Sequence, residues 1–261
     1  MFILELNQIY LGDCLEIMKE IDDKLIDMIL CDLPYGTTAC KWDTIIPFES
    51  LWVQYKRIIK DNGAIVLTGQ EPFSSNLRLS NVEMYKYDWI WEKSNPSNIA
   101  ASKTRPLKYH EVVSVFYKKQ PIYNPQMIKR DALGTKRLQN KNNPIRFSGS
   151  DIQGTPKKKQ DYDIDRYDEN YKNPSTVLKI KSQRGKLHPT QKPVELFEYL
   201  IKTYTNEDEI VLDNCIGSGT TAIAAINTGR NYVGIEKDKN YYELAKKRIV
   251  EHSNYNVSGT T

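Results

Sequence analysis

The chain of 261 residues is poor in the side chains that build metal centres and disulfide frameworks, with four cysteines and three histidines. The cysteines, at positions 14, 31, 40 and 215, show no C-x-x-C spacing. The sequence therefore predicts no metal site and no disulfide framework, and we expect reduced cysteines.

Long apolar runs are also missing. No stretch of 18 apolar residues and no signal peptide occurs, so we expect no membrane-spanning segment and a cytoplasmic protein. The hydrophobic content of 39% is that of a globular protein, and the length suffices for one domain with an insertion.

The common nucleotide-binding patterns are absent as well. No Walker sequence G-x-x-x-x-G-K-[ST] occurs, which argues against ATP as a phosphate donor. Gly217 and Gly219 are not followed by a third glycine three residues on, so the dinucleotide pattern G-x-G-x-x-G is not met. This argues against NAD and FAD as cofactors.

A short polar motif, D-L-P-Y-G, stands at residues 32–36. It follows an apolar run at residues 26–31 that is typical of a buried parallel strand. A carboxylate, a proline-fixed backbone and an aromatic ring at such a strand end form a polar pocket with a stacking face. This pocket suits a planar ring with an exocyclic amine, although Asp and Pro at a strand end are also ordinary turn formers.

A second motif combines a strand at residues 209–213, a glycine loop at 214–221 and a helix at 222–227. The glycines let the backbone approach a ligand closely, and the helix start offers free N–H groups. The next strand, at residues 231–235, ends in Glu236, whose carboxylate can accept hydrogen bonds from ribose hydroxyls. The pattern predicts a cofactor that carries a ribose.

Together the two motifs resemble those of the DNA amino-methyltransferases that use S-adenosyl-L-methionine. Their amine-binding tetrad, D/N/S-P-P-Y, stands here as D-L-P-Y at residues 32–35, and their cofactor loop, D-P-F-x-G-S-G-T-T, as D-N-C-I-G-S-G-T-T at 213–221. Residues 188–193 match the family element H-P-T-x-K-P. Because the tetrad comes first and the cofactor loop last, the order resembles the permuted beta class.

The alternation of predicted strands and helices indicates an α/β fold with a mainly parallel sheet covered on both faces. The resemblance implies a doubly wound, seven-stranded, permuted Rossmann-like methyltransferase fold. It assigns residues 1–117 and 181–261 to the catalytic and cofactor-binding domain and residues 118–180 to a target-recognition insertion. We predict strands near residues 8–11, 26–31, 64–67, 87–91, 111–117, 209–213 and 231–235, and helices near 15–21, 51–60, 194–204, 222–227 and 240–251.

The resemblance also assigns the catalytic tetrad to Asp32, Leu33, Pro34 and Tyr35. An exocyclic amine is a poor nucleophile, so the Asp32 carboxylate and the Leu33 carbonyl are expected to accept its two hydrogens and localise its lone pair. Tyr35 would stack on a base that has been rotated out of the duplex.

The cofactor residues follow from the same resemblance, with Asp213 on the methionine amino group and Glu236 on the ribose. Thr190 and Lys192 are expected at the methionine end, whereas Asp13 fits either a contact near the cofactor's adenine or a helix N-cap. Asn214 and Cys215 replace the usual Pro and Phe, which removes an apolar wall. The expected cofactor-binding residues are Asp13, Thr190, Lys192, Asp213, Cys215, Gly217, Gly219, Thr220 and Glu236.

An Asp at position 32 is the usual adenine form of the tetrad, so we favour adenine N6 and keep cytosine N4 as the alternative. Cytosine C5 methylation is disfavoured because no proline in the chain is followed by the cysteine that usually supplies the thiolate.

The net charge of +4 conceals an asymmetry. Residues 118–186 hold 17 Lys and Arg against 7 Asp and Glu, interspersed with Asn, Gln, Ser and Gly. This composition suits phosphate contacts and base-edge hydrogen bonds, and the resembled family carries its target-recognition region here. A solvated loop is the simpler alternative. The expected contacts with double-stranded DNA are Lys129, Arg130, Lys136, Arg137, Arg146, Lys157, Lys158 and Lys159.

Two protein partners are left open by the resemblance, a second copy in a homodimer and a cognate restriction endonuclease. Two further functions also stay open. One is methylation of RNA or of a protein glutamine, against which the basic insertion argues. The other is a non-catalytic DNA-binding protein that retains the cofactor fold, against which intact Asp32 and Tyr35 argue.

Overall fold

The computed structural model describes residues 4–37, 43–130, 170–182 and 191–258, and side chains as far as residue 254. The chain forms two compact units. One combines Met1–Asn124 with Thr176–Thr261, and the other is Pro125–Ser175. In the smaller unit, strand β6 (Ile128–Lys129) pairs antiparallel with β7 (Tyr171–Lys172).

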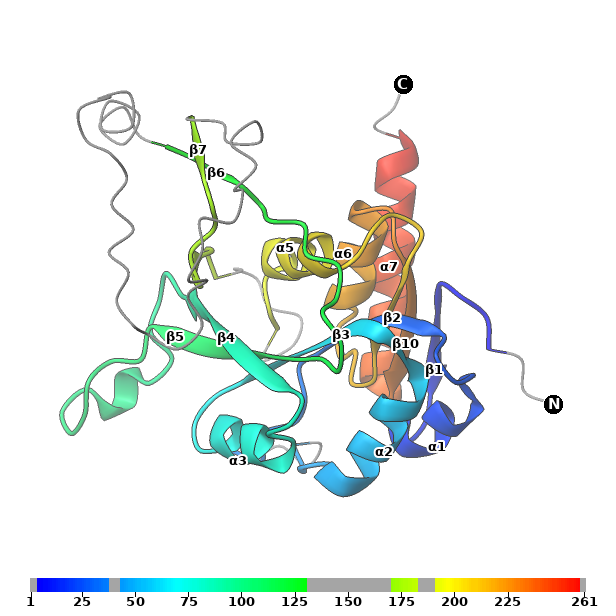
Figure 1. Cartoon of the computed structure of the whole chain (residues 1–261), viewed down its shortest axis with the longest axis horizontal. Helices are drawn as coiled ribbons and strands as arrows, with labels where there is room; N and C mark the ends of the chain where they lie inside the picture. Colours follow the sequence, from blue (N-terminus) through cyan, green and yellow to red (C-terminus); the bar gives the residue numbers. More distant parts are fainter. Residues whose placement is uncertain (1–3, 38–42, 131–169, 183–190, 259–261) are drawn as a thin grey trace, which may run out of the picture. The chain divides into compact units, whose positions relative to one another are not determined.

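The larger unit contains one twisted sheet of eight strands (Figure 1). All neighbouring pairs are parallel except those of β5, which runs antiparallel to both of its neighbours. In spatial order the strands are β1 (Gln8–Leu11), β10 (Asn231–Glu236), β9 (Ile210–Asp213), β2 (Ile26–Cys31), β3 (Ile59–Gly69), β5 (His110–Phe116), β4 (Tyr85–Glu92) and β8 (Val177–Lys179).

Helices cover both faces of this sheet (Figure 1). One face is covered by α5 (Val194–Tyr204), α6 (Thr220–Asn227) and α7 (Lys239–Ser258). The other face is covered by α1 (Cys14–Ile17), the 3-10 turn η1 (Met18–Glu20), α2 (Phe48–Ile58) and α3 (Phe73–Ser80).

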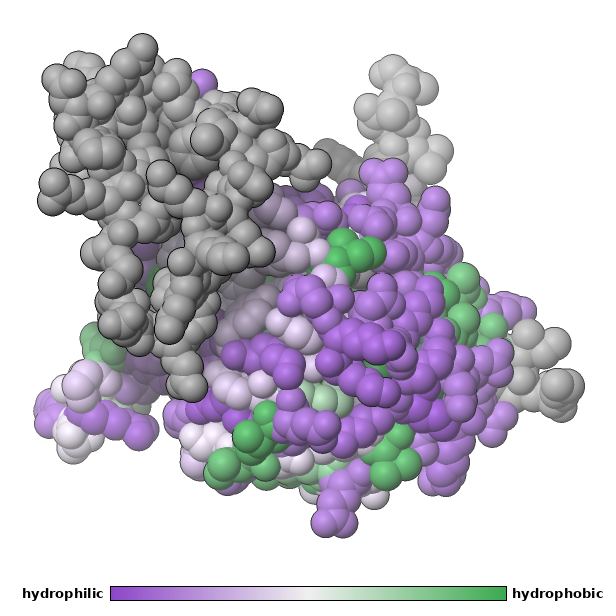
Figure 2. All heavy atoms as spheres, viewed as in Figure 1, coloured by the Kyte–Doolittle hydropathy of each residue, from purple (hydrophilic) through white to green (hydrophobic). Residues whose placement is uncertain are grey.

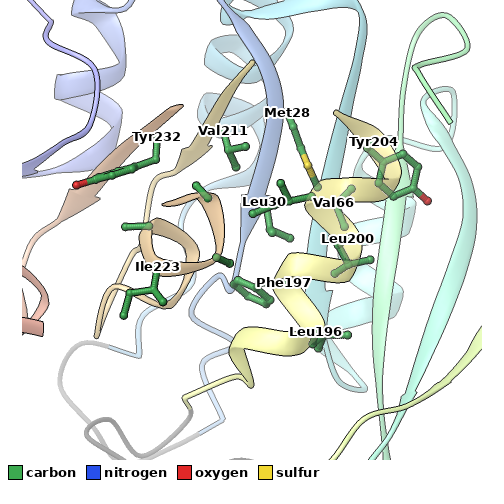
Figure 3. Close-up of a cluster of buried hydrophobic side chains, with 14 of the residues drawn as sticks. Met28, Leu30, Val66, Leu196, Phe197, Leu200, Tyr204, Val211, Ile223 and Tyr232 are labelled. Carbon is green, nitrogen blue, oxygen red and sulfur yellow. The ribbon is translucent and has the colours of Figure 1, made fainter. Parts of the chain in front are cut away.

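The central strand β2 shows why two cores form. All six of its residues are buried, and successive side chains of a strand point to opposite faces. Met28 and Leu30 therefore pack under α5 and α6, as Figure 3 shows, while Ile29 and Cys31 pack against α2 on the other face. A strand that is buried on both faces has a continuous run of apolar residues, and the apolar run at residues 26–31 was the basis for predicting β2.

The predicted α/β architecture is confirmed, but the sheet has eight strands, not seven. The additional strand, β8, has only three residues, and it pairs with the edge strand β4. Three residues are too short for a period-two pattern to stand out from the neighbouring sequence. Helix α3 was also missed, and the helix expected at 15–21 divides into α1 and η1.

The parallel strands place their carboxyl ends at one edge of the sheet. β2 ends directly before Asp32, β9 ends at Asp213 and β10 ends at Glu236. The antiparallel strand β5 begins at the same edge, so its second residue, Glu111, lies there too. Residues far apart in the chain are thereby brought together.

Candidate active site

A cavity of about 1250 Å³ opens at this carboxyl edge, within the larger unit. Both sequence motifs line it, which is the central relationship of the site. The predicted residues that line it are Asp13, Asp32, Leu33, Pro34, Tyr35, Lys192, Asp213, Cys215, Gly217, Thr220 and Glu236.

The Asp32 carboxylate is held through both of its oxygens. The Tyr35 hydroxyl donates a hydrogen bond of 2.6 Å to Oδ1, and the Thr68 hydroxyl, from the end of β3, donates to the same oxygen. The Lys192 ammonium lies 2.6 Å from Oδ2. Asp32 retains 20% exposure of its side chain, so it faces the cavity while its orientation is fixed.

Lys192 continues into a chain of buried charges. Its Nζ lies 3.3 Å from Glu111 Oε2, and Lys93 Nζ lies 2.8 Å from Glu111 Oε1. Burial by itself would lower the pKa of Lys192, but the Asp32 and Glu111 carboxylates outweigh it, and the pKa is raised. Burial would likewise raise the pKa of Glu111, yet Lys192 and Lys93 bring it down to about 2. The raised pKa of Lys192 and the lowered pKa of Glu111 therefore keep this pair ionised at neutral pH.

The Tyr35 ring lies against neighbours that fix its position. Its centroid is 5.0 Å from that of Phe73 on α3, and the Lys192 ammonium lies 5.4 Å above the ring. Burial, followed by the nearby Asp32 charge, raises the pKa of the Tyr35 hydroxyl, so this group stays a hydrogen-bond donor at neutral pH.

On the cofactor side, Asp213 is almost fully buried. Its Oδ1 accepts a 3.0 Å hydrogen bond from the Cys215 N–H, and its Oδ2 accepts one from the Thr221 hydroxyl. Burial raises the pKa of Asp213 to about 6, even though these hydrogen bonds oppose the rise.

Glu236 is tied to the glycine loop. Its Oε2 accepts a 2.8 Å hydrogen bond from the Gly217 N–H, and its Oε1 accepts one of 2.8 Å from the Asp238 N–H. Burial raises the pKa of Glu236. Gly217 and Gly219 have φ values of 53° and 80°, a region that glycine enters at little cost.

Among the predicted cofactor-binding residues that the structure describes, Gly219 alone does not line the cavity. It caps the start of α6, and a Cβ added there would stand 3.3 Å from the Ala245 Cβ of α7. The structure thus shows Gly219 at a helix-packing contact. Asp13 is the N-cap of α1, since its Oδ1 accepts a 2.9 Å hydrogen bond from the Leu15 N–H. Asp13 also lines the cavity, and its contact with the cofactor's adenine stays a prediction.

The two unusual loop residues have partners that explain their presence. Asn214 is buried, and its Oδ1 accepts a 2.5 Å hydrogen bond from the Tyr55 hydroxyl of α2. Cys215 lies beside Cys14 and Cys31, with which it shares thiol hydrogen bonds. The hydrogen bond with Cys14 lowers the pKa of the Cys215 thiol, but the hydrogen bond with Cys31 and burial outweigh it and hold the pKa well above its usual range, so the group stays a neutral thiol.

The other predicted residues belong to the smaller unit or fall outside the described residues. Lys129 and Arg130 belong to the smaller unit, where Arg130 Nε donates a 2.8 Å hydrogen bond to the Tyr171 carbonyl. Outside the described residues are Thr190, Lys136, Arg137, Arg146, Lys157, Lys158 and Lys159. Their assigned roles stay predictions.

Sequence reasoning missed three residues of the site, Thr68, Lys93 and Glu111. Each stands at the carboxyl edge of the sheet, Thr68 and Lys93 at the ends of β3 and β4 and Glu111 at the start of β5. The place of these residues at strand ends was the only indication that the sequence offered. It identifies a site only when the order of the strands in the sheet is known.

The chain matches the family model of N6/N4 DNA methylases over residues 26–247. It is similar to the type II methyltransferase M2.MboI of Moraxella bovis, with 29% identity over 93% of this chain and 87% of that protein. It is also similar to the type II methyltransferase M.HinfI of Haemophilus influenzae, with 28% identity over 94% of this chain and 69% of that protein.

Solved structures give the same result. The crystal structure of the M1.HpyAVI complex with SAM shares 28% identity and a TM-score of 0.59, covering 92% of this chain and 98% of that one. The cytosine-N4-specific PvuII DNA methyltransferase shares the fold, with a TM-score of 0.61 over 95% of this chain and 91% of that one at 15% identity.

Fold, site and comparisons define a DNA methyltransferase. The chain belongs to the N6/N4 family of DNA methylases, since the family model spans most of its length. This confirms the resemblance to the S-adenosylmethionine-dependent DNA amino-methyltransferases. Among the described residues, no helix has the length and apolar character needed to cross a bilayer.

Proposed function

We propose that this protein methylates the exocyclic N6 amine of adenine in double-stranded DNA, with S-adenosyl-L-methionine as the methyl donor. The observation that carries the proposal is that the amine-binding tetrad and the cofactor loop line one cavity. A methyl transfer needs donor and acceptor in direct line at close range, and a shared cavity provides this.

The residues present fit this cofactor. S-adenosylmethionine carries an ammonium group and two ribose hydroxyls, and the cavity presents the carboxylates of Asp213 and Glu236 from adjacent strands. Bound there, it supplies a methyl group on a sulfonium sulfur. Glu236 would accept hydrogen bonds from the ribose, while Asp213 would hold the ammonium group once its carboxyl is ionised.

Asp32 would orient the target amine. Its carboxylate accepts one amine hydrogen and the Leu33 carbonyl the other, so the nitrogen is held with its lone pair directed away from both acceptors. As the bond from sulfur to the methyl group breaks and the nitrogen gains positive charge, the Asp32 carboxylate would stabilise that charge until one amine proton is lost to solvent. The hydroxyls of Tyr35 and Thr68 keep the Asp32 side chain in one orientation, which avoids reorganisation during the reaction.

The base reaches this cavity only by leaving the duplex, at a cost of about a few kcal/mol. The Tyr35 ring, fixed against Phe73, would stack on the base and offset part of that cost. Adenine is favoured over cytosine because Asp32 is the form of the tetrad usual for adenine. Target recognition would come from the insertion at residues 118–180 with its basic side chains.

The test incubates purified protein with unmethylated genomic DNA and labelled S-adenosylmethionine, then identifies the labelled nucleoside by mass. We expect label in N6-methyladenine. Label in N4-methylcytosine would keep the amine mechanism but replace the base. No label, with cofactor binding demonstrated separately, would overturn the DNA methylation assignment. Asp32→Asn should retain DNA binding and lose about 100-fold or more in kcat, because an amide does not stabilise the cationic nitrogen.

A cognate restriction endonuclease is the proposed protein partner, because the relatives M2.MboI and M.HinfI are type II methyltransferases. Methylated DNA should then resist cleavage by an endonuclease with the same recognition sequence. A homodimer and a cytoplasmic location stay predictions.

A further inference from the structure

Strands β4 and β5 are joined by a long excursion, Ser94–Tyr109, which we call the arm. It leaves the sheet at the carboxyl edge, where β4 ends and β5 begins, and carries the 3-10 turn η2 (Ile99–Ala101). It is the segment that projects at the lower left of Figure 1. In Figure 2 the same projection is mostly purple and pale. The arm is therefore an exposed, largely polar extension beside the active-site edge.

Charge on the arm has one sign. It contains Lys103, Arg105 and Lys108 and no Asp or Glu. Lys103 and Arg105 are exposed, and within the part of the chain that the structure describes neither side chain has an ion-pair or hydrogen-bond partner. Two unpaired cations on an acid-free extension are complementary to a polyanion.

The arm is internally braced. The Asn98 amide donates a 3.0 Å hydrogen bond to the Pro106 carbonyl and accepts one of 2.6 Å from the Lys108 N–H, which ties the two limbs together. At the base, Lys108 Nζ donates a 3.0 Å hydrogen bond to Gln70 Oε1, beside the end of β3. The arm is thus held in a defined place relative to the catalytic strands.

That place is the wall of the cavity. Ser97, Asn98, Arg105, Pro106 and Lys108 line the same cavity as Asp32 and Tyr35. Next to this wall, at the start of η2, the apolar side chain of Ile99 is 66% exposed. Cations combined with an exposed apolar side chain are the pairing that proteins use to hold phosphates and to contact unstacked bases.

We propose that the arm contacts duplex DNA on the flank of the target nucleotide, with Lys103 and Arg105 on backbone phosphates and Ile99 against the bases beside the extruded one. This rests on the proposed function, since it assumes that a base enters the cavity. Base extrusion breaks stacking on both sides, and an apolar side chain beside the cavity, that of Ile99, offsets that loss. Apart from the catalytic tetrad, DNA contacts are predicted from the sequence only in the insertion at residues 118–180, so the arm is an additional surface.

The phosphate contacts are tested with the double variant Lys103→Ala/Arg105→Ala. Each lost phosphate contact lowers the slope of log K against log salt by about 1. From about 50 to about 200 mM salt the wild type should therefore lose about tenfold more affinity than the variant. At low salt, the double variant should lose the same amount of DNA affinity for specific and for non-specific duplexes.

The matched control is Lys56→Ala/Lys202→Ala. These exposed lysines stand near the ends of α2 and α5, which lead into β3 and β9 and so lie at the opposite edge of the sheet. The control should keep the wild-type slope. If the arm variant and the control gave the same slope as the wild type, the arm would not bind phosphates and the proposal would be overturned.

The apolar contact is tested with Ile99→Ser and 2-aminopurine at the target position, which fluoresces when it leaves the stack. We expect at least a fivefold smaller fluorescence rise, restored when the target base is mispaired and costs less to extrude. The control Val250→Ser changes an equally apolar residue on α7 that is 58% exposed. An unchanged rise in Ile99→Ser would overturn the role of Ile99.

Different results would overturn the role of the arm and the proposed function. A wild-type protein that transfers methyl groups to DNA while both arm variants match their controls would overturn the arm and leave the proposed function intact. A wild-type protein that neither binds nor methylates DNA would overturn the proposed function and with it the arm.

Discussion

The Lys192 ammonium lies 2.6 Å from Asp32 Oδ2 and 3.3 Å from Glu111 Oε2, so one buried cation stands between two carboxylates. Apart from this ion pair, Glu111 Oε2 has no hydrogen-bond partner among the described residues. The same Asp32 is the proposed acceptor for the target amine. A small movement of Lys192 toward Glu111 would therefore free Asp32 Oδ2 for the incoming base without leaving the cation unpaired.

Glu111→Gln tests this movement of Lys192 from Asp32 toward Glu111, which we call the handover. The neutral amide at position 111 no longer attracts the Lys192 ammonium. Lys192 therefore stays paired with Asp32 and competes with the target amine for its carboxylate. We expect kcat to fall about tenfold with unchanged cofactor affinity, because only one of the charge-assisted contacts is weakened. Glu111→Asp should recover part of the rate. The control Glu92→Gln, which removes an exposed carboxylate paired with Lys179 at 3.4 Å, should leave kcat unchanged. An unaltered kcat in Glu111→Gln would contradict the handover.

Lys192→Met tests the same cluster through stability. The side chain of Lys192 is only 4% exposed, and its loss leaves two partly buried carboxylates without their shared cation. We expect the free energy of unfolding, measured in urea, to fall by about 3 kcal/mol. Asp32→Asn in the same background should recover part of the loss because one unpaired charge disappears. Lys179→Met, at an exposed pair, should change it by less than about 1 kcal/mol. Equal losses in the two lysine variants would show that burial of the pair does not matter.

Asp213 predicts how cofactor binding depends on pH. Burial raises its pKa to about 6, so the carboxyl is mostly protonated below that pH. A ligand ammonium binds the ionised form, so binding at pH 5 must first release a proton. The affinity for S-adenosylhomocysteine, which carries the same ammonium, should therefore increase from pH 5 to 7 and then level off. Titration calorimetry in buffers of different ionisation enthalpy measures the released proton. Asp213→Asn should bind more weakly and show no such rise, and a rise that persisted would assign the proton to another group.

The sequence predicted the architecture and the motif strands because those strands, β2 and β9, have strong apolar patterns followed by polar loops. It located Asp32, Tyr35, Asp213 and Glu236, which all line the cavity. It did not find Lys93 or Glu111, because a single charged residue at a strand end has no local pattern, and only the antiparallel pairing of β4 with β5 brings them together. The expected place of Lys192 at the methionine end of the cofactor stays a prediction, but its ion pairs with Asp32 and Glu111 were not foreseen. Such contacts depend on the pairing of strands that are far apart in the chain. The periodicity of apolar residues does not reveal which strands pair.

A comparison of Gly219→Ala with Gly229→Ala separates the effect of packing from that of backbone strain in the cofactor loop. Gly219 has a φ of 80°, and an added Cβ would stand 3.3 Å from the Ala245 Cβ, so the variant suffers both effects. Gly229 has a similar φ of 70°, but an added Cβ there meets nothing closer than 3.7 Å. Gly229→Ala should therefore lower the free energy of unfolding by about 1 kcal/mol through strain alone.

Gly219→Ala should cost about 1 kcal/mol more than Gly229→Ala, because α6 and α7 must separate slightly to admit the methyl group. It should also weaken cofactor binding, since Thr220, the first residue of α6, lines the cavity and moves with that helix. Urea unfolding and calorimetric titration of both variants measure the two quantities. If the two glycine variants lost equal stability and bound the cofactor equally well, the contact with Ala245 would not set the position of the loop.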